Sequence, residues 1–146
     1  MQIVENQNLY FDNVLSYVSG MDNTQTMGLV NHILKNLESI GLEVREKVMF
    51  TYSDSETEFL IPLKNEKTYE NSGYRIKPKF KMINAVKIRF EGDFGEIDIA
   101  LKALEKYISE KKYRVISRPY YVVVRSNVNS NSGIWDIYIS IDGNIF

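Results

Sequence analysis

The sequence contains no cysteine and only one histidine, His32. Without thiols the chain can form neither a disulfide nor a thiolate metal site, and it has no cysteine nucleophile. One histidine cannot supply the several imidazole ligands of a typical zinc site. We therefore expect no metal and no cofactor. His32 itself falls on the polar side of a predicted helix, which favours an exposed side chain over a general base.

Neither sign of charge dominates the chain, and long apolar runs are missing. There are 18 Lys and Arg against 19 Asp and Glu, a net charge of -1, so the chain lacks the positive field that draws a protein to nucleic acid. No apolar run is long enough to span a bilayer, and the N-terminus lacks the basic and apolar regions of a signal peptide. We expect a cytoplasmic protein that contacts neither a membrane nor, directly, nucleic acid.

Basic residues do alternate with apolar ones at one place, the RIKPKFK run of residues 75–81. Charges on alternate residues are typical of the solvated face of a strand, and a proline there marks an edge or an interruption. We prefer this interpretation to a nucleic-acid-binding stripe, because the cations of one strand do not form a binding groove.

Aromatic residues, by contrast, are abundant: 10 Tyr, 7 Phe and 1 Trp make 12% of the chain. They supply core volume and the flat walls of apolar pockets, and tyrosine adds a polar group. Most should pack in the core, and a few are candidates for a ligand site. The remaining composition, 44% hydrophobic and 25% charged in 146 residues, is typical of one globular domain.

The first half of the chain predicts a strand, a helix and two more strands. Residues 13–19 alternate as in a half-buried strand. Apolar residues at three- and four-residue spacing predict a helix over 24–40, and Gly41 provides the left-handed residue that ends it. Apolar runs at 42–52 and 58–63, separated by the polar TYSDSET, predict a hairpin.

The second half repeats this order. After a further strand at 73–82, residues 84–90 predict a strand, and 94–109 predict a helix that begins after the Gly-Asp turn of FEGDFGE. Two strands, 120–124 and 134–141, close the repeat on either side of the polar SNVNSNSG. The similar words LKNLES and LKALEK occupy corresponding places in the two helices.

The chain is therefore predicted to be a single α+β domain over residues 1–146, made of two βαββ repeats. The first spans about 1–63 and the second about 73–146, with a polar linker at about 64–72. One such unit leaves apolar sheet and helix surface uncovered. Two copies about a pseudo-twofold axis would bury it, giving antiparallel sheets, two main helices and a ligand cleft between the halves.

The stretch FEGDFGEIDIALKALEKYISEKKYRV, preceded by KPKFKMINAVKI and followed by IWDIYISI, resembles the second half of the GyrI-like effector-binding domain. The first half carries ETEFLIPL as the counterpart of IWDIYISI, so the resemblance covers nearly the whole chain. It implies SHS2-like repeats. The family includes the ligand-sensing domains of bacterial AraC-type and MerR-type transcription regulators, stand-alone binding proteins, a gyrase inhibitor and hydrolases of cyclopropane-bearing compounds. Too few residues precede position 13 for a helix-turn-helix, so we expect a stand-alone form.

The resemblance also implies which residues line the ligand site. Asp136 takes the place of the acidic residue on the closing strand, and Glu58 is its counterpart in the first repeat. Tyr107 matches the aromatic residue near the end of the second helix. Neighbouring strand residues face opposite sides, so at most one of Trp135 and Asp136, and one of Tyr120 and Tyr121, should enter a cleft. The predicted ligand-binding residues are Glu58, Asp136, Tyr107, Trp135, Tyr121, Phe11 and Tyr17.

The function implied is binding of a small lipophilic molecule, cationic or aromatic, for multidrug sensing or sequestration, with the state passed to a separate transcription regulator. A carboxylate in an apolar cleft suits a lipophilic cation. The alternative is that Glu58 and Asp136 face outward and that the aromatics pack in the core. One alternative function is a surface that binds gyrase. Another is a hydrolase in which Glu58 or Asp136 acts as general base and Tyr107 orients the substrate. No catalytic motif is present, so we expect binding rather than catalysis.

Overall fold

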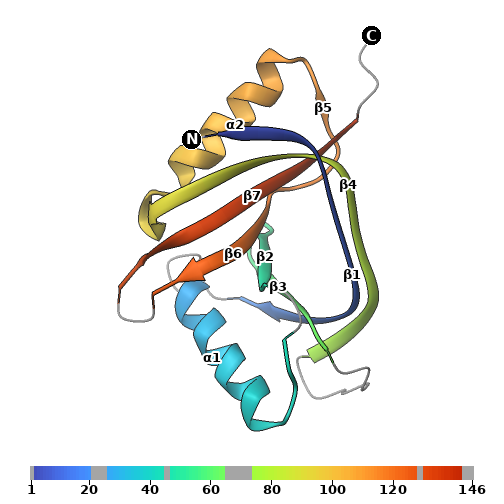
Figure 1. Cartoon of the computed structure of the whole chain (residues 1–146), viewed down its shortest axis with the longest axis vertical. Coiled ribbons are helices and arrows are strands. Elements are labelled where there is room, and N and C mark those ends of the chain that lie inside the picture. Colours follow the sequence, from blue (N-terminus) through green and yellow to red (C-terminus); the bar gives the residue numbers. More distant parts are fainter. Residues whose placement is uncertain (1, 21–25, 45–46, 65–73, 128–129, 143–146) are drawn as a thin grey trace. The chain divides into compact units, whose positions relative to one another are not determined.

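The computed structural model of the chain describes residues 2–20, 26–44, 47–64, 74–127 and 130–142. This part contains two α-helices and seven strands. The registered strand pairs are antiparallel, which confirms the predicted α+β class. The elements in chain order are β1 (Ile3–Ser19), α1 (Thr26–Ser39), β2 (Met49–Tyr52), β3 (Thr57–Pro62), β4 (Tyr74–Asp93), the 3-10 turn η2 (Phe94–Glu96), α2 (Asp98–Glu110), β5 (Arg114–Val115), β6 (Tyr120–Ser126) and β7 (Ser132–Asp142) (Figure 1).

The chain forms two compact units. The unit of residues Tyr10–Phe80 is called the β3 unit after its central strand, and the unit of Met1–Leu9 with Lys81–Phe146 is called the β7 unit. Strands β1 and β4 contribute to both, because the unit boundaries fall inside them. The first residues of β1 therefore lie with the second half of the chain.

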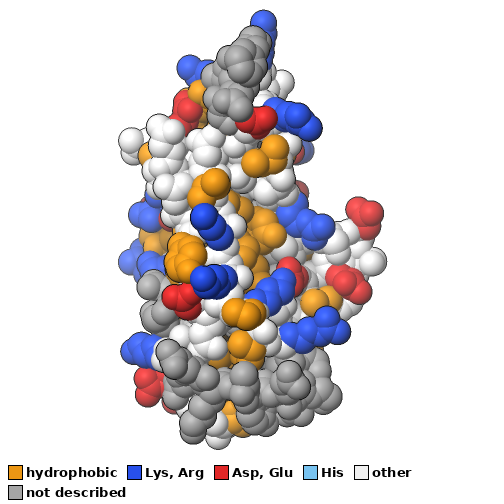
Figure 2. Space-filling model, turned by 90° about the vertical axis from the view of Figure 1, so that its right-hand side faces the viewer, with side chains coloured by type: hydrophobic (Ala, Val, Ile, Leu, Met, Phe, Trp, Pro, Cys, Tyr) orange, Lys and Arg blue, Asp and Glu red, His pale blue; other side chains and the backbone are white. Residues whose placement is uncertain are grey.

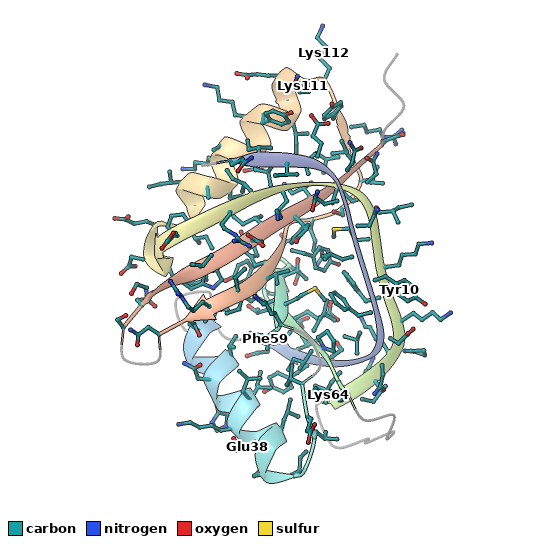
Figure 3. All side chains as sticks on the ribbon, in the orientation of Figure 1. Tyr10, Glu38, Phe59, Lys64, Lys111 and Lys112 are labelled. Carbon is teal, nitrogen blue, oxygen red and sulfur yellow. The ribbon has the colours of Figure 1, made fainter. Side chains whose placement is uncertain are left out.

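In the β3 unit, β3 pairs with β1 on one edge and with β2 on the other. The register places Phe59 beside Phe50, and alternation puts both on the same face as Tyr52. The Tyr52 hydroxyl lies 2.9 Å from Oγ1 of Thr26 in the first turn of α1, so this is the face that α1 covers. Phe59, labelled in Figure 3, is fully buried there.

Helix α1 buries one face, as the apolar spacing predicts, and ends where the sequence indicates. Gly41 has a φ of 80°, and the amide of Leu42 donates to the carbonyl of Leu37 at 3.0 Å. These features are typical of a glycine-ended helix. The start predicted at residue 24 lies outside the described residues. The buried residues of α1 are Thr26, Val30, Ile33 and Leu37.

In the β7 unit, β7 pairs with β4, β6 and β5. Oδ1 of Asp93 accepts a hydrogen bond from the amide of Gly95 at 2.8 Å and so caps the 3-10 turn η2, whereas α2 begins at Asp98, later than the predicted residue 94 and without a side-chain cap. Phe94 of η2 packs on Trp135, with ring centroids 5.1 Å apart, and Phe90 stacks on Trp135 at 6.2 Å. These rings mark the sheet face on which α2 lies (Figure 1). The buried residues of α2 are Ala100, Leu104 and Ile108.

Strand β4 is one strand of 20 residues, so the prediction of separate strands at 73–82 and 84–90 was wrong. The predicted break is a single left-handed residue, Asn84, with a φ of 54°. Its Nδ2 donates to the carbonyl of Ile141 at 3.2 Å, and its amide donates to Oδ1 of Asn8 at 3.0 Å. A left-handed asparagine can bend a strand while its hydrogen-bonding groups stay satisfied.

Other boundaries also differ from the prediction. Strand β1 begins at Ile3 rather than at residue 13. The strand predicted at 42–52 was wrong in length: β2 covers only its end, and Val44 forms an isolated bridge to Leu63. Apart from Lys64, the predicted linker lies outside the described residues. No helix in the described ranges is long and apolar enough to cross a membrane.

The basic run on β4 has the exposure expected of a solvated strand face. Arg75, Lys77 and Lys79 are exposed, whereas Ile76 is half-buried, and the strand continues through Pro78. Figure 2 shows Lys and Arg side chains interspersed with hydrophobic ones on one face of the molecule. The cations are thus spread among apolar groups and do not form a continuous basic stripe.

Candidate functional site

Asp136 lies at the middle of β7, directly across from Arg89 on β4. The Arg89 guanidinium donates from Nε to Oδ1 at 2.8 Å and from Nη2 to Oδ2 at 3.0 Å. This is the two-pronged geometry in which arginine holds a carboxylate most firmly. The Asp136 side chain is only 6% exposed, whereas that of Arg89 is 52% exposed. The hydrogen bond to Asp136 also raises the pKa of Arg89.

A second cation lies close to the same carboxylate. Nζ of Lys87 is 4.0 Å from Oδ2 of Asp136, and the Lys87 side chain is 21% exposed. Strand alternation places Lys87, Arg89 and Asp136 on one sheet face. We call these three residues the Asp136 cluster. Two cations and one carboxylate give it a net positive charge of one.

Two tyrosines share the face of the Asp136 cluster. Tyr138 pairs across from Lys87 on β4, and Tyr120 of β6 pairs across from Tyr138. Tyr138 is buried, and its burial, followed by the charge of Asp136, raises the pKa of the phenol. A neutral hydroxyl is therefore held beside the buried charges.

Trp135 and Tyr121 point to the other side of this sheet. Trp135 packs between Phe90 and Phe94 on the face that α2 covers, and Tyr121, paired with Ile137, lies on that face too. Both are buried. Nε1 of Trp135 has no hydrogen-bond partner among the described residues. The sheet separates these two predicted site residues from Asp136.

Glu58 occupies the corresponding closing strand of the β3 unit. One of its oxygens, Oε2, accepts from Oγ of Ser16 at 2.8 Å and from Nζ of Lys77 at 2.9 Å. The side chains of Glu58 and Lys77 are 25% and 45% exposed. Both carboxylates predicted from the repeat are thus held by a cation from β4. The arrangement around Glu58 is more open, and its cation makes a single contact.

Tyr17 and Phe11, the predicted pocket walls of the first repeat, are half-buried. Tyr17 pairs across from Phe59 and stacks on it at 6.3 Å, on the face that α1 covers. Glu58, the next residue to Phe59, lies on the opposite face. Phe11 stacks on Phe80 at 6.5 Å. One pocket on the sheet of this unit cannot take both Tyr17 and Glu58.

Tyr107, near the end of α2, is bound by a residue that the sequence did not indicate. Its hydroxyl donates to Oε2 of Glu5 on β1, and the hydroxyl of Tyr113 donates to Oε1 at 2.7 Å. The bond to Glu5 is the main reason why the pKa of Tyr107 rises to about 12. The same two hydrogen bonds lower the pKa of Glu5, and the bond from Tyr107 has the larger effect. Lys111, at the end of α2 in Figure 3, lies 5.6 Å from the Tyr107 ring.

A hollow of about 590 Å³ opens at the end of the β7-unit sheet. It begins at Glu91, two residues beyond Arg89 on β4. Register places Glu91 and Arg125 on either side of Ile134, on the face of the Asp136 cluster. The hollow contains none of the seven predicted site residues, and its surface is polar and apolar in about equal parts. Its lining residues are Glu91, Gly92, Arg125, Ser126, Asn127, Ser132 and Gly133.

Comparison with known proteins yields matches among solved structures only, because no family model and no curated protein matches the chain. The C-terminal domain of EcmrR aligns with a TM-score of 0.76 at 13% identity, over 97% of each chain. EcmrR in a DNA complex aligns with a TM-score of 0.76 at 14% identity, over 97% of this chain but 57% of that one. The chain therefore spans little more than half of the longer EcmrR chain.

Two further structures are similar at lower scores. A hydrolase from Listeria innocua aligns with a TM-score of 0.59 at 10% identity, over 97% of this chain and 90% of that one. The protein SAV2435, bound to tetraphenylphosphonium, aligns with a TM-score of 0.52 at 10% identity, over 97% of this chain and 93% of that one. At such identities the likeness is one of fold. The resemblance to the GyrI-like effector-binding domain is confirmed at that level.

No group of three or more His, Asp or Glu side chains within the described residues could hold a metal ion. What the site does offer is one buried carboxylate, two cations and two tyrosines on one sheet face of the β7 unit. Such a face can bind a small molecule through charge, hydrogen bonds and ring stacking.

Proposed function

We propose that this chain is a small-molecule-binding domain of the effector-binding type, with a lipophilic ligand. The observation that carries the proposal is the burial of Asp136 on the sheet face away from α2, with Arg89 across from it. A buried ion pair contributes little net stability, because desolvation offsets the attraction. Charge kept at such a position is therefore better explained by recognition than by folding.

The two halves of the chain support the same proposal. We take the strand-helix-strand-strand order to be a repeat with a pseudo-twofold relation, in which Glu58 on β3 and Asp136 on β7 are equivalent. Each holds a cation of β4, Lys77 or Arg89, which would contact the ligand. Tyr138 and Tyr120 would offer ring surface near Asp136, whereas Trp135, Tyr121 and Tyr17 would support the sheets from their helix-covered faces.

The biological role that fits this domain is sensing or sequestering the ligand in the cytoplasm, with the state passed to a separate regulator. The C-terminal domain of EcmrR has this fold, and the longer EcmrR chain was solved in a complex with DNA. SAV2435 was solved with a lipophilic cation. The likeness to SAV2435 supports a lipophilic ligand for this chain, cationic or aromatic, and the likeness to EcmrR supports a link to transcription.

A thermal-shift screen tests the proposal. The wild-type protein is mixed with lipophilic cations, neutral aromatics and lipophilic anions, and the screen is repeated on Asp136→Asn and Glu58→Gln. A ligand at about a hundred times its Kd should raise the midpoint by about 5–10 °C. One of the two carboxamide variants should lose most of that shift, while Glu105→Gln, on the exposed face of α2, should keep it. If no compound shifts the wild type, the small-molecule function is wrong and a surface-binding role becomes the next hypothesis.

A further inference from the structure

We infer that Arg89 determines the charge of the ligand at Asp136. Its guanidinium occupies the place that a cationic ligand would take, so this face of the β7 unit selects uncharged or anionic lipophilic molecules and rejects lipophilic cations. The inference rests on the proposed function, because it concerns the same site. It corrects the expectation that a carboxylate on the closing strand recruits a cation.

The first step is the saturation of the carboxylate. Both oxygens of Asp136 accept from Arg89, at 2.8 and 3.0 Å. The Arg89 side chain does not have to extend far to Asp136, because the two residues face each other across neighbouring strands. A cation that approaches Asp136 must displace the guanidinium from both bonds. A fork held by two parallel bonds resists displacement better than a single contact does.

The second step is the excess of positive charge. Lys87 adds a cation 4.0 Å from the same carboxylate. Farther along this face Glu91 adds one negative charge and Arg125 one positive charge, so the net charge of the face stays at plus one. The charges near Asp136 are shielded from water on one side, and charges interact more strongly there than in bulk solvent. A bound monocation would therefore meet net repulsion, whereas an anion would meet attraction.

The third step is the surface that remains for a ligand. Arg89 is half exposed, so part of its side chain is open to a ligand, and a planar guanidinium can stack on an aromatic ring. Tyr138, two positions beyond Asp136 on β7, is the next residue on this face, and burial raises the pKa of its phenol and favours the neutral hydroxyl. An aromatic molecule can thus lie against Arg89 without contacting the carboxylate. The ligand class assigned to this face is a flat or aryl-bearing molecule with no positive charge.

The experiment uses two probes of equal size and shape but opposite charge, tetraphenylphosphonium and tetraphenylborate, with neutral triphenylphosphine oxide as the third. Titration calorimetry gives a Kd for each with wild type, Arg89→Met, Arg89→Lys and Lys102→Met. Wild type should bind tetraphenylborate about tenfold or more tighter than tetraphenylphosphonium. Arg89→Met should reverse that order, because Asp136 is then open to a ligand cation.

The two other variants separate charge at this site from charge in general. Arg89→Lys keeps the cation but loses the fork, so the preference should survive in weakened form. Lys102→Met removes an exposed lysine of α2, which covers the opposite face of the sheet, and it should leave the ratio of the two Kd values within about twofold of wild type. If circular dichroism shows that Arg89→Met is unfolded, Arg89→Met with Asp136→Asn removes the whole pair. The preference for the anion should then fall, since only Lys87 sustains it.

Failure of the inference can be told from failure of the proposed function. If wild type binds all three probes alike, or binds tetraphenylphosphonium more tightly, the binding function stands and the role of Arg89 is wrong. If wild type binds none but Arg89→Met binds tetraphenylphosphonium, Arg89 is confirmed as the block and the wild-type function must be revised. If no variant binds any probe, both are overturned.

Discussion

Glu5 accepts hydrogen bonds from two tyrosines that come from distant parts of the sequence. Tyr107 at the end of α2 and Tyr113 after it both donate to this carboxylate, which lies on β1. The bonds favour the charged form of Glu5 and the neutral form of the phenols. Glu5 therefore attaches the first residues of the chain to α2 and fixes the Tyr107 hydroxyl, so that this hydroxyl is not free to orient a substrate.

The effect on ionisation gives a prediction for Glu5→Gln. The pKa of Tyr107 should fall from about 12 toward its ordinary value of 10, because the bond to Glu5 is the main cause of the rise. Ultraviolet titration of tyrosinate, compared with the same titration of Tyr107→Phe, isolates this group. An unchanged Tyr107 titration in Glu5→Gln would contradict the hydrogen bond.

The same pair sets a pH window for stability. Glu5 has a pKa below its ordinary 4.5, so its contribution is present above that value and is lost as pH falls through the lowered pKa. Tyr107 has a raised pKa, so its contribution is present below 10 and is lost as pH rises toward 12. The stability difference between wild type and Glu5→Gln should thus be largest near neutral pH. Glu110→Gln, an exposed carboxylate at the end of α2, is the matched control.

At the level of single residues, the sequence indicated the carboxylates but not their partners. Asp136 and Glu58 were found from the repeated pattern of the closing strands. Arg89 could not be found in that way, because its importance depends on the register between β4 and β7. The same register decides that Tyr120, and not Tyr121, shares a face with Asp136. Alternation alone shows that two neighbours face opposite sides, and it does not say which side is covered by a helix.

At the level of elements, hydrophobic spacing predicted both helices well and the long strands poorly. The apolar faces of α1 and α2 follow from a helical period, and Gly41 and Asp93 mark an end and a start by local chemistry. The division of β4 was mistaken because Pro78 and Asn84 are residues that usually interrupt a strand. Here Pro78 is exposed to solvent. At Asn84, where the backbone leaves the regular strand conformation, the side chain donates a hydrogen bond to the carbonyl of Ile141 on β7.

The hairpin of β6 and β7 depends on a glycine that no local rule identifies. A Cβ added to Gly133 would lie 2.4 Å from the carbonyl oxygen of Arg125 and 3.0 Å from the Trp135 ring. Gly133→Ala must therefore shift the backbone of one strand, and we expect it to destabilise the protein by about 1–3 kcal/mol. Urea unfolding measures the change.

A second glycine provides the control, because its substitution by alanine should change the free energy of unfolding in the opposite direction. Gly28 lies in the first turns of α1, and a Cβ added there would meet nothing within 4 Å. Gly28→Ala should therefore stabilise the protein by about 0.5–1 kcal/mol, since alanine loses less backbone entropy in a helix. Equal effects of the two substitutions would contradict the crowding at Gly133.

At the level of the whole molecule, the order of elements could be predicted, but the path of the chain between units could not. The sequence suggests that each half of the chain forms its own unit. In the structure β1 and β4 each serve both units, and the N-terminal residues through Leu9 belong with the second half. Long strands that serve two units leave no local signal, because each part of them has ordinary strand alternation.

Shared strands predict that the two units unfold together, because neither keeps a complete sheet when the other is lost. The only tryptophan, Trp135, lies in the β7 unit, so its fluorescence reports that unit alone. Ile61→Val removes a buried methylene from the β3 unit and should cost about 1 kcal/mol. In a single cooperative transition it should lower the urea midpoint of Trp135 fluorescence as much as that of far-ultraviolet circular dichroism.

Ile88→Val, the same change in the β7 unit, is the matched control and should shift both signals by a similar amount. If Ile61→Val moved the dichroism curve but left the fluorescence midpoint unchanged, the units would unfold independently. The two units would then gain their stability separately in spite of the strands they share. Coincident shifts would instead mean that a ligand bound on the β7 unit also stabilises the β3 unit, since it would act on one folding equilibrium.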